Sequence, residues 1–310
     1  HMSTLTRLSK VWDKVQDLSK DHWDNLVPTK DIRFVSLDTM NIGSDSHLLT
    51  GQAQNQVALR LGVPMTYLKK CPPSVQAYNL NHWIKEERND KMFIRFNGPK
   101  IRALFTPRYQ PVDNKEVIKK LESYGYDGDT EVQCTLDDEF MNLSIPDERR
   151  GFQLPGNDKM YPGISISNSE VGLASLSISA FVLRLVCTNG LITKSDVSAS
   201  YRHISDRILG DFNSILRQFS QDTDQMKQQW MISLESPVHD AQATLSSFNR
   251  QFNLRDNEIQ AVEWAWNIEQ GPHLFHVINS YTKAAQYPQL SAESVYRLQK
   301  TGGSILSLVR

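Results

Sequence analysis

The chain has 310 residues, a formal charge of −1 and 39% hydrophobic residues, which is typical of an ordinary globular protein. This length fits one large domain or two ordinary ones, and no apolar run approaches the roughly 18 residues of a membrane helix. We therefore expect no membrane partner. Cys71, Cys134 and Cys187 lie far apart and form no C-x-x-C pair. This pattern argues against a zinc site and favours reduced thiols in the cytoplasm.

The first hundred residues mix helical and strand patterns. Apolar residues recur at helical spacing in residues 5–18, 50–61 and 65–70, with Gly62 and Pro72-Pro73 as stops. Residues 54–71 are compatible with a helix-turn-helix motif, although the two prolines leave its second helix under about two turns. An ordinary helical hairpin is the alternative. A short strand is expected at residues 32–35.

Strand patterns dominate the middle of the chain. Residues 92–96 and 101–105 flank Asn97-Gly98, a dipeptide that favours tight turns, and predict a β-hairpin. A helix is expected at residues 114–123. Further strands are expected at residues 131–136, 140–145, 165–167 and 175–179.

The pattern becomes helical from residue 205 onward. Helices are expected at about residues 205–234, 238–251, 256–269, 272–286 and 291–308. The sequence therefore predicts an α+β fold with three parts. These are an N-terminal helical segment (1–48), an α+β core with antiparallel β-hairpins (49–204), and a C-terminal helical bundle (205–310).

The near-neutral total charge conceals two blocks of opposite sign. Residues 91–120 contain eight Lys/Arg and two acidic residues, whereas residues 121–148 contain nine Asp/Glu and no Lys/Arg. Three interpretations are compatible with such blocks: they bind a polar partner, they pair between subunits of a homo-oligomer, or they compensate each other within one molecule.

The basic block interleaves cations with aromatic residues. Its hairpin and the segment after it carry Arg95, Lys100, Arg102, Arg108 and Tyr109, near Phe93, Phe96 and Phe105. Cations attract phosphates and aromatic rings stack on bases, so this pattern predicts binding of single-stranded DNA or RNA. Solvated arginines and core-facing aromatic residues are the alternative.

Residues 161–203 predict a second hairpin with an arginine in an apolar strand. Arg184 shares the parity of the apolar positions, and a Cys-Thr-Asn-Gly turn containing Asn189 follows, with Arg202 and His203 beyond it. An unpaired buried arginine is too costly, so Arg184 must bind an anion or pair with a carboxylate. Arg184, Asn189, Arg202 and His203 form one candidate patch. A structural pair with Glu170 or an acidic-block residue is the alternative for Arg184.

Patterns typical of enzymes are weak in this sequence. Cys187 and His203 are a thiolate–imidazole pair only if the fold joins them. Acidic turns at residues 127–129 and 137–139 offer oxygen ligands for Mg²⁺, and His273 and His276 share a helix face. No phosphate-binding loop, dinucleotide fingerprint, nucleophile elbow or HExxH motif occurs. We expect neither a metal nor a cofactor, and catalytic residues stay unassigned.

The signature of residues 168–190 resembles a known family. Asn168-Ser169, Gly172 and the run from Arg184 to Gly190, with Val186-Cys187-Thr188-Asn189, are similar to domain of unknown function 932. Arg102-Ala103, Arg108-Tyr109, Asp113-Asn114, residues 279–287 and the final QKTGGSIL also resemble that family. The resemblance implies a phage or plasmid origin, and therefore a host-cell cytoplasm, but no settled activity.

These observations favour a non-catalytic nucleic-acid-binding protein of a mobile element. We expect a self-assembling single-strand binder or an annealing factor in recombination or replication. The alternative is a phage assembly or host-takeover module that binds other proteins, and a metal-dependent nuclease-like enzyme is the third hypothesis.

Overall fold

The computed structural model describes residues 5–193, 199–201 and 223–310. By internal contacts the chain divides into unit 2, Val15–Pro111, and unit 1, which comprises His1–Lys14 and Val112–Arg310. The predicted α+β class is confirmed, with antiparallel sheets in the middle of the chain and helices toward its end. The boundary predicted at residue 48 lies inside unit 2, and the one at residue 204 lies outside the described residues.

Unit 1 is built on an antiparallel sheet with the order β1-β8-β9-β11-β12-β13, to which β10 and β14 add beside β11 and β12. The predicted hairpin is β11–β12, where Ile166 lies opposite Ile178. The strands are β1 (Thr6–Arg7), β8 (Glu131–Leu136), β9 (Met141–Pro146), β10 (Phe152–Leu154), β11 (Asp158–Asn168), β12 (Leu176–Arg184), β13 (Asn189–Thr193) and β14 (Ala199–Tyr201).

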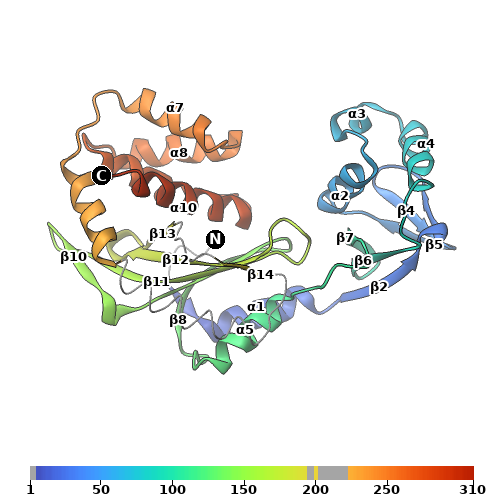
Figure 1. Ribbon diagram of the computed structural model, residues 1–310, viewed down its shortest axis with the longest axis horizontal. Helices are drawn as coiled ribbons and strands as arrows, with labels where there is room; N and C mark the ends of the chain where they lie inside the picture. Colours follow the sequence, from blue (N-terminus) through green and yellow to red (C-terminus); the bar gives the residue numbers. More distant parts are fainter. Residues whose placement is uncertain (1–4, 194–198, 202–222) are drawn as a thin grey trace. The chain divides into compact units, whose positions relative to one another are not determined.

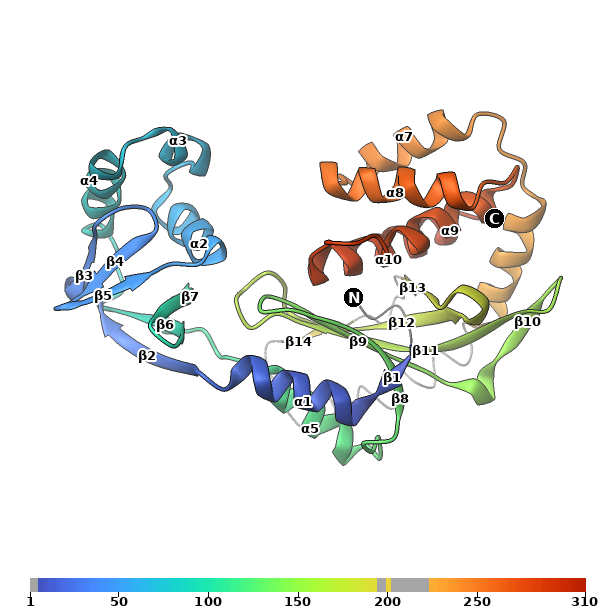
Figure 2. The same ribbon diagram turned by 180° about the vertical axis from the view of Figure 1, so that it is seen from behind.

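Helices cover both faces of this sheet (Figures 1 and 2). Helices α9 and α10 pack on one face of the sheet, and α7 and α8 lie outside them. Helix α5 and the start of α1 lie on the other face. The helices are α1 (Leu8–Ser19), α5 (Asn114–Ser123), residues 223–235, α7 (Ala241–Gln251), α8 (Asp256–Ile268), α9 (Leu274–Ala284) and α10 (Ala292–Ser307), with short 3₁₀ turns η2 (Glu148–Arg150) and η3 (Leu185–Cys187). Apolar side chains from β11, β12 and β13 join those of α8, α9 and α10 in one core. No described helix is long and apolar enough to span a bilayer.

Unit 2 contains two three-stranded sheets and three helices around its own apolar core. One sheet is β2 (His22–Pro28), β6 (Lys91–Asn97) and β7 (Lys100–Phe105); the other is β3 (Ile32–Phe34), β4 (Thr39–Ile42) and β5 (Asp45–Leu48), after η1 (Thr29–Asp31). The helices are α2 (Gly51–Leu61), α3 (Met65–Lys70) and α4 (Pro73–Ile84).

Local chemistry explains the helix ends of unit 2. The Thr50 hydroxyl accepts a hydrogen bond from the Ala53 N–H and starts α2, and Gly62 ends it at φ 71°. Helix α3 ends at Lys70, before the two prolines. Proline suits the first turn of a helix, and Pro73 is the first residue of α4. Residues 54–71 are therefore part of an array of three helices, in which α3 has only six residues.

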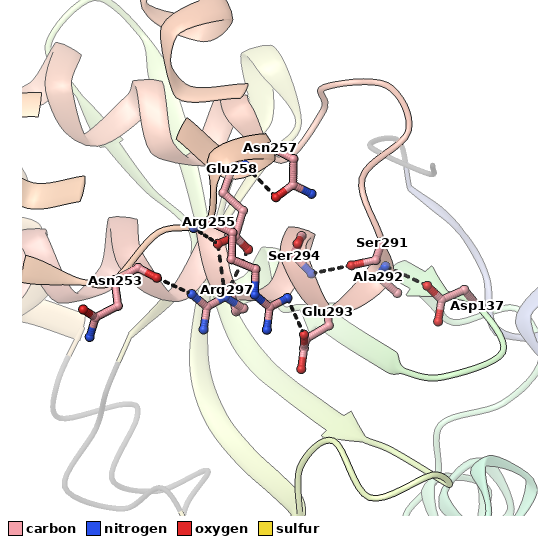
Figure 3. A network of polar contacts seen from close by, with 10 residues as sticks. All are labelled: Asp137, Asn253, Arg255, Asn257, Glu258, Ser291, Ala292, Glu293, Ser294 and Arg297. Carbon is pink, nitrogen blue, oxygen red and sulfur yellow. Dashed lines mark hydrogen bonds and ion pairs between the residues drawn. The ribbon is translucent and has the colours of Figure 1, made fainter. Parts of the chain in front are cut away.

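A buried acidic side chain joins the C-terminal helices of unit 1 (Figure 3). Glu258 of α8 is fully buried, and Arg297 of α10 donates to its carboxylate at 3.0 Å and to the Asn253 carbonyl at 2.9 Å. The Arg255 backbone N–H donates to the same carboxylate at 2.9 Å. At the edge of this network, Arg255 forms a more exposed ion pair with Glu293. The inner pair therefore compensates a charge that water does not reach.

We expect Arg297→Ala to lower the free energy of unfolding by about 3–5 kcal/mol, because it leaves the Glu258 carboxylate buried without its cation. Arg255→Ala is the matched control, since it removes a half-exposed pair worth at most about 1 kcal/mol. Urea denaturation followed by circular dichroism measures both. Equal losses for the two variants would contradict a special role for the buried pair.

Candidate functional site

The arginine of the signature segment has a carboxylate partner. Arg184 lies at the end of β12, where its Nε donates to Asp158 Oδ2 at 2.7 Å. The guanidinium also lies 5.0 Å from the Phe275 ring centroid and 3.5 Å from Cys187 Sγ. The two charged side chains are only 17% and 11% exposed. Arg184 is therefore part of a structural ion pair, with Asp158 as its partner rather than Glu170.

The turn after Arg184 differs from the predicted one. The chain reverses through η3, with Thr188 at φ 50°, and Asn189 and Gly190 already belong to β13. A side chain at Gly190 would collide with Gln133 and with the Phe181 ring. Close packing therefore explains the glycine of the Asn-Gly dipeptide, and the residue with a left-handed backbone conformation is Thr188 rather than Gly190.

Asn189 is buried between the sheet and the turn that follows α9, and its contacts there are amide groups rather than an anion. Its Oδ1 accepts a hydrogen bond of 2.6 Å from Gln286 Nε2, which also donates to the Cys187 carbonyl at 2.9 Å. Gln133 of β8 donates to the Thr188 carbonyl at 2.8 Å. We call residues 185–190 the signature turn. Amide side chains therefore hold this turn against both the sheet and the helical part of unit 1.

A second polar cluster joins two other sequence elements that resemble the family. The Asn168 side chain at the end of β11 donates to the Val112 carbonyl at 3.0 Å and to Asn114 Oδ1 at 2.9 Å. The Asn114 N–H donates to the buried Glu170 carboxylate at 2.8 Å. This carboxylate lies at the N-terminus of α5, where the helix dipole favours negative charge.

Two arginines of the basic block are buried inside unit 2. Arg95 is 1% exposed and its Nε lies 3.0 Å from Asp24 Oδ1, directly across the β2–β6 register. Arg102 is 5% exposed. Their burial contradicts the prediction that these two guanidiniums contact phosphates. For Arg95 the prediction failed because the sequence did not reveal strand β2 and its aspartate. Lys100 and Arg108 are exposed.

The remaining predicted site residues are only partly covered by the described residues. Tyr109 is half-buried and stacks on Phe105 with ring centroids 3.6 Å apart. Arg202 and His203 lie outside the described residues, and so does the proposed Cys187–His203 pair. Since Arg95, Arg102 and Asn189 are buried, the nine predicted residues do not form one surface.

A surface that the sequence did not reveal lies on α3 and α4. We define the aromatic surface as Tyr67, Tyr78, His82 and Trp83, in which the Tyr and Trp side chains are 45%, 76% and 45% exposed in chain order. Tyr78 and His82 stack with centroids 6.4 Å apart, and His82 meets Trp83 edge-on at 4.9 Å. Asn79 donates to the Tyr67 hydroxyl at 3.4 Å and links the two helices.

Exposed lysines lie close in the sequence to this aromatic surface. The side chains of Lys69, Lys70 and Lys85 are exposed at the ends of α3 and α4. The i, i+4 spacing of Tyr78 and His82, opposite the buried Leu80 and Ile84, is the signal that could have revealed it. The double proline concealed this signal, because it suggested a helix end rather than a new helix.

The acidic turn between β8 and β9 is occupied by structural contacts. Asp137 accepts from the backbone N–H groups of Glu139 and Phe140 through one oxygen and from Ala292 through the other, each at 2.9 Å. Burial raises the pKa of Glu139, with Asp137 adding to the effect. Among the described residues no group of three or more His, Cys, Asp or Glu side chains is placed to hold a metal.

A cavity of about 340 Å³ lies where β9 and β11 meet η2. Its charged lining is internally compensated, because the Nε atoms of Arg149 and Arg150 lie 3.2 and 3.5 Å from the Asp147 carboxylate, and Glu148 adds a second negative charge. Compensated charges favour neither an anion nor a cation, so this cavity does not indicate a ligand.

Comparison with known proteins identifies one family. A family model described as "Domain of unknown function (DUF932)" matches residues 103–291, which confirms the resemblance noted from the sequence. No curated protein matches the chain, and no solved structure matches it. The matched residues include the signature turn, whereas the aromatic surface lies before them.

The described cysteines differ in their thiol environments, which predicts an order of reactivity. Burial raises the pKa of Cys187, opposed by Arg184, and raises the pKa of Cys134 to about 12. A raised pKa lowers the thiolate fraction near neutral pH. We expect iodoacetamide to label Cys71 first, Cys187 more slowly and Cys134 last, with labelling of Cys187 accelerating as pH rises.

Peptide mass spectrometry of the folded protein measures this order, with Cys187→Ser as the control for assignment. Faster labelling of Cys187 than of Cys71 near neutral pH would indicate an activated thiolate and would revive the nucleophile hypothesis.

Proposed function

We propose that this chain, which belongs to the DUF932 family, binds single-stranded nucleic acid through the aromatic surface of unit 2. The observation that carries the proposal is the exposure of Tyr67, Tyr78 and Trp83 beside three lysines on α3 and α4. The proposal rests on the chain's own residues, since the family description assigns no activity and its match begins at residue 103.

The aromatic rings can attract nucleic acid because bases stack on them. A base stacked on an aromatic side chain contributes about 1–3 kcal/mol, and every base has a face that can stack. Tyr78 stacks on His82 and His82 meets Trp83 edge-on, so the three rings of α4 form one continuous series. Bases in a duplex already stack on one another, so this surface favours single strands and tolerates any sequence.

Charge adds a second attraction. Unit 2 contains thirteen Lys/Arg and nine Asp/Glu residues, whereas the whole chain has a charge of −1. Lys69 and Lys70 follow Tyr67 directly, and Lys85 follows the last turn of α4. Contacts from these lysines to phosphates release counterions, and affinity then falls as salt rises. The first acidic residue after α4 is the exposed Glu86, which follows Lys85 directly.

The family resemblance adds a biological context to the proposal. A phage or plasmid origin would place single-strand binding in replication or recombination. The second hypothesis is a protein-interaction module, which the sequence predicts from the paired basic and acidic blocks of residues 91–120 and 121–148. The aromatic surface is compatible with it too, because Tyr and Trp are also enriched at protein–protein hot spots. Salt dependence and affinity for a bare oligonucleotide distinguish the two.

We expect Tyr78→Ala and Trp83→Ala each to weaken binding of a labelled single strand of about 30 nucleotides by roughly tenfold. Fluorescence anisotropy measures this affinity at several salt concentrations, with a duplex of the same sequence for comparison. Tyr78→Phe retains the ring and is expected to retain the affinity. Leu59→Ala is the matched control, because Leu59 is 84% exposed on α2 but carries no ring.

Two results would contradict the proposal. One is an affinity at low salt no higher than that of an unrelated neutral protein. The other is equal affinity for the Tyr78→Ala, Trp83→Ala and Leu59→Ala proteins when circular dichroism shows all three to be folded. Either result would favour the protein-interaction module.

A further inference from the structure

The buried amides behind the signature turn are oriented by a chain of hydrogen bonds. Lys283 Nζ donates to Gln286 Oε1 at 2.9 Å, and a lysine ammonium can only donate. The amide nitrogen of Gln286 therefore faces the other way, where it donates to the Cys187 carbonyl and to Asn189 Oδ1. Reversing Gln286 would set its oxygen against that carbonyl, so this orientation is the one that satisfies both ends of the Gln286 amide.

The same chain fixes the orientation of Asn189. Because its oxygen receives the Gln286 N–H, its own amide nitrogen points away from Gln286. That nitrogen is buried and has no hydrogen-bond partner among the described residues. Asn189 as a whole is 3% exposed. A buried donor in this position costs about 1–3 kcal/mol unless an acceptor meets it.

Asn189 is one of the residues that line a small cavity. Its volume is about 20 Å³, and it is bounded by β8, the signature turn, α9 and α10. The residues that line it include Gln133, Thr135, Asn189, Thr282 and Gln299, and none of its lining side chains is charged. A volume of roughly 10–15 Å³ is enough for one water molecule when two to four polar groups surround it.

We propose that this cavity binds a single water molecule, which accepts the hydrogen bond from Asn189 Nδ2. The ligand must be an acceptor, because the free group is a donor. It must be neutral, because no charged side chain lines the cavity, and the volume excludes anything larger than water. The side-chain oxygens of Gln133 and Thr135 on β8 are the acceptors for its own protons. The water thereby links strand β8 to the signature turn.

This assignment gives Asn189 a role different from the predicted anion ligand. The asparagine spans the interface, with its oxygen bound to Gln286 in the turn after α9 and its nitrogen bound to β8 through water. Aspartate would supply no such donor, and leucine would fill a similar volume without any polar group. The choice of asparagine at this position thus follows from the need for one acceptor and one donor.

The test is a crystal structure of the full chain at about 1.5 Å, with the Asn189→Leu protein solved under the same conditions. We expect a water peak at about 2.7–3.2 Å from Asn189 Nδ2, and its loss in Asn189→Leu. Thr135→Val is the second variant, which removes one acceptor but keeps Asn189. It is expected to shift the water or lower its occupancy.

If Asn189→Leu does not fold, nuclear Overhauser effects between bulk-derived water and the ¹⁵N-labelled Asn189 side chain in the unaltered protein decide the question. A long-lived water signal at that amide supports the site. The proposal is overturned by a well-ordered Asn189 without a water peak, by an Asn189 nitrogen bonded to a protein acceptor, or by the absence of such a signal.

Discussion

The close approach of α10 to β13 is the constraint on which the interior of unit 1 depends. A β-carbon on Gly303 would collide with the Ile192 carbonyl, and one on Gly302 would lie 2.9 Å from a Thr282 methyl group. The helix backbone therefore lies almost on the strand backbone. Such an approach is possible only where glycine removes the side chain, and it leaves little height between helix and sheet for large apolar residues.

The limited height explains why the interface beside this contact is polar. Gln299, one turn before Gly303, is 4% exposed and meets Asn142 and Gln133 at 3.4 Å. Flat amide groups fit a thin gap and pair with one another, which offsets the cost of burying them. Gly190 completes the arrangement, since a side chain there would displace Gln133. The signature segment and the final QKTGGSIL are thus packed against each other in one interface.

The chemistry of Arg184 follows from the same interface. The strand that brings Val182 into the helical core carries Arg184 toward the same face two residues later. There the guanidinium meets Phe275 of α9 and the Asp158 carboxylate rather than solvent. Parity predicts the face of this residue, but only the register of β11 against β12 supplies the partner, because Asp158 lies 26 positions earlier in the chain.

The same distinction separates what the sequence could and could not predict elsewhere. Residues 114–123 and 131–136 are recovered with their bounds as α5 and β8, because their periodicity is local. Strand β2 was missed because four consecutive residues from Trp23 are exposed, so it has no alternating pattern. Because β2 was missed, Asp24 was not recognised as a partner for Arg95, and the burial of Arg95 could not be inferred.

The position of the aromatic surface has its own physical meaning. The core of unit 2 is complete without it, since Leu80 and Ile84 of α4 already bury against the sheets. Tyr78, at 76% exposure, therefore contributes little to folding, and a large exposed ring is explained more readily by recognition than by stability. Because this surface lies in unit 2 and precedes the residues matched to the family, substitutions on it test the proposed binding without altering the residues of the polar interface of unit 1.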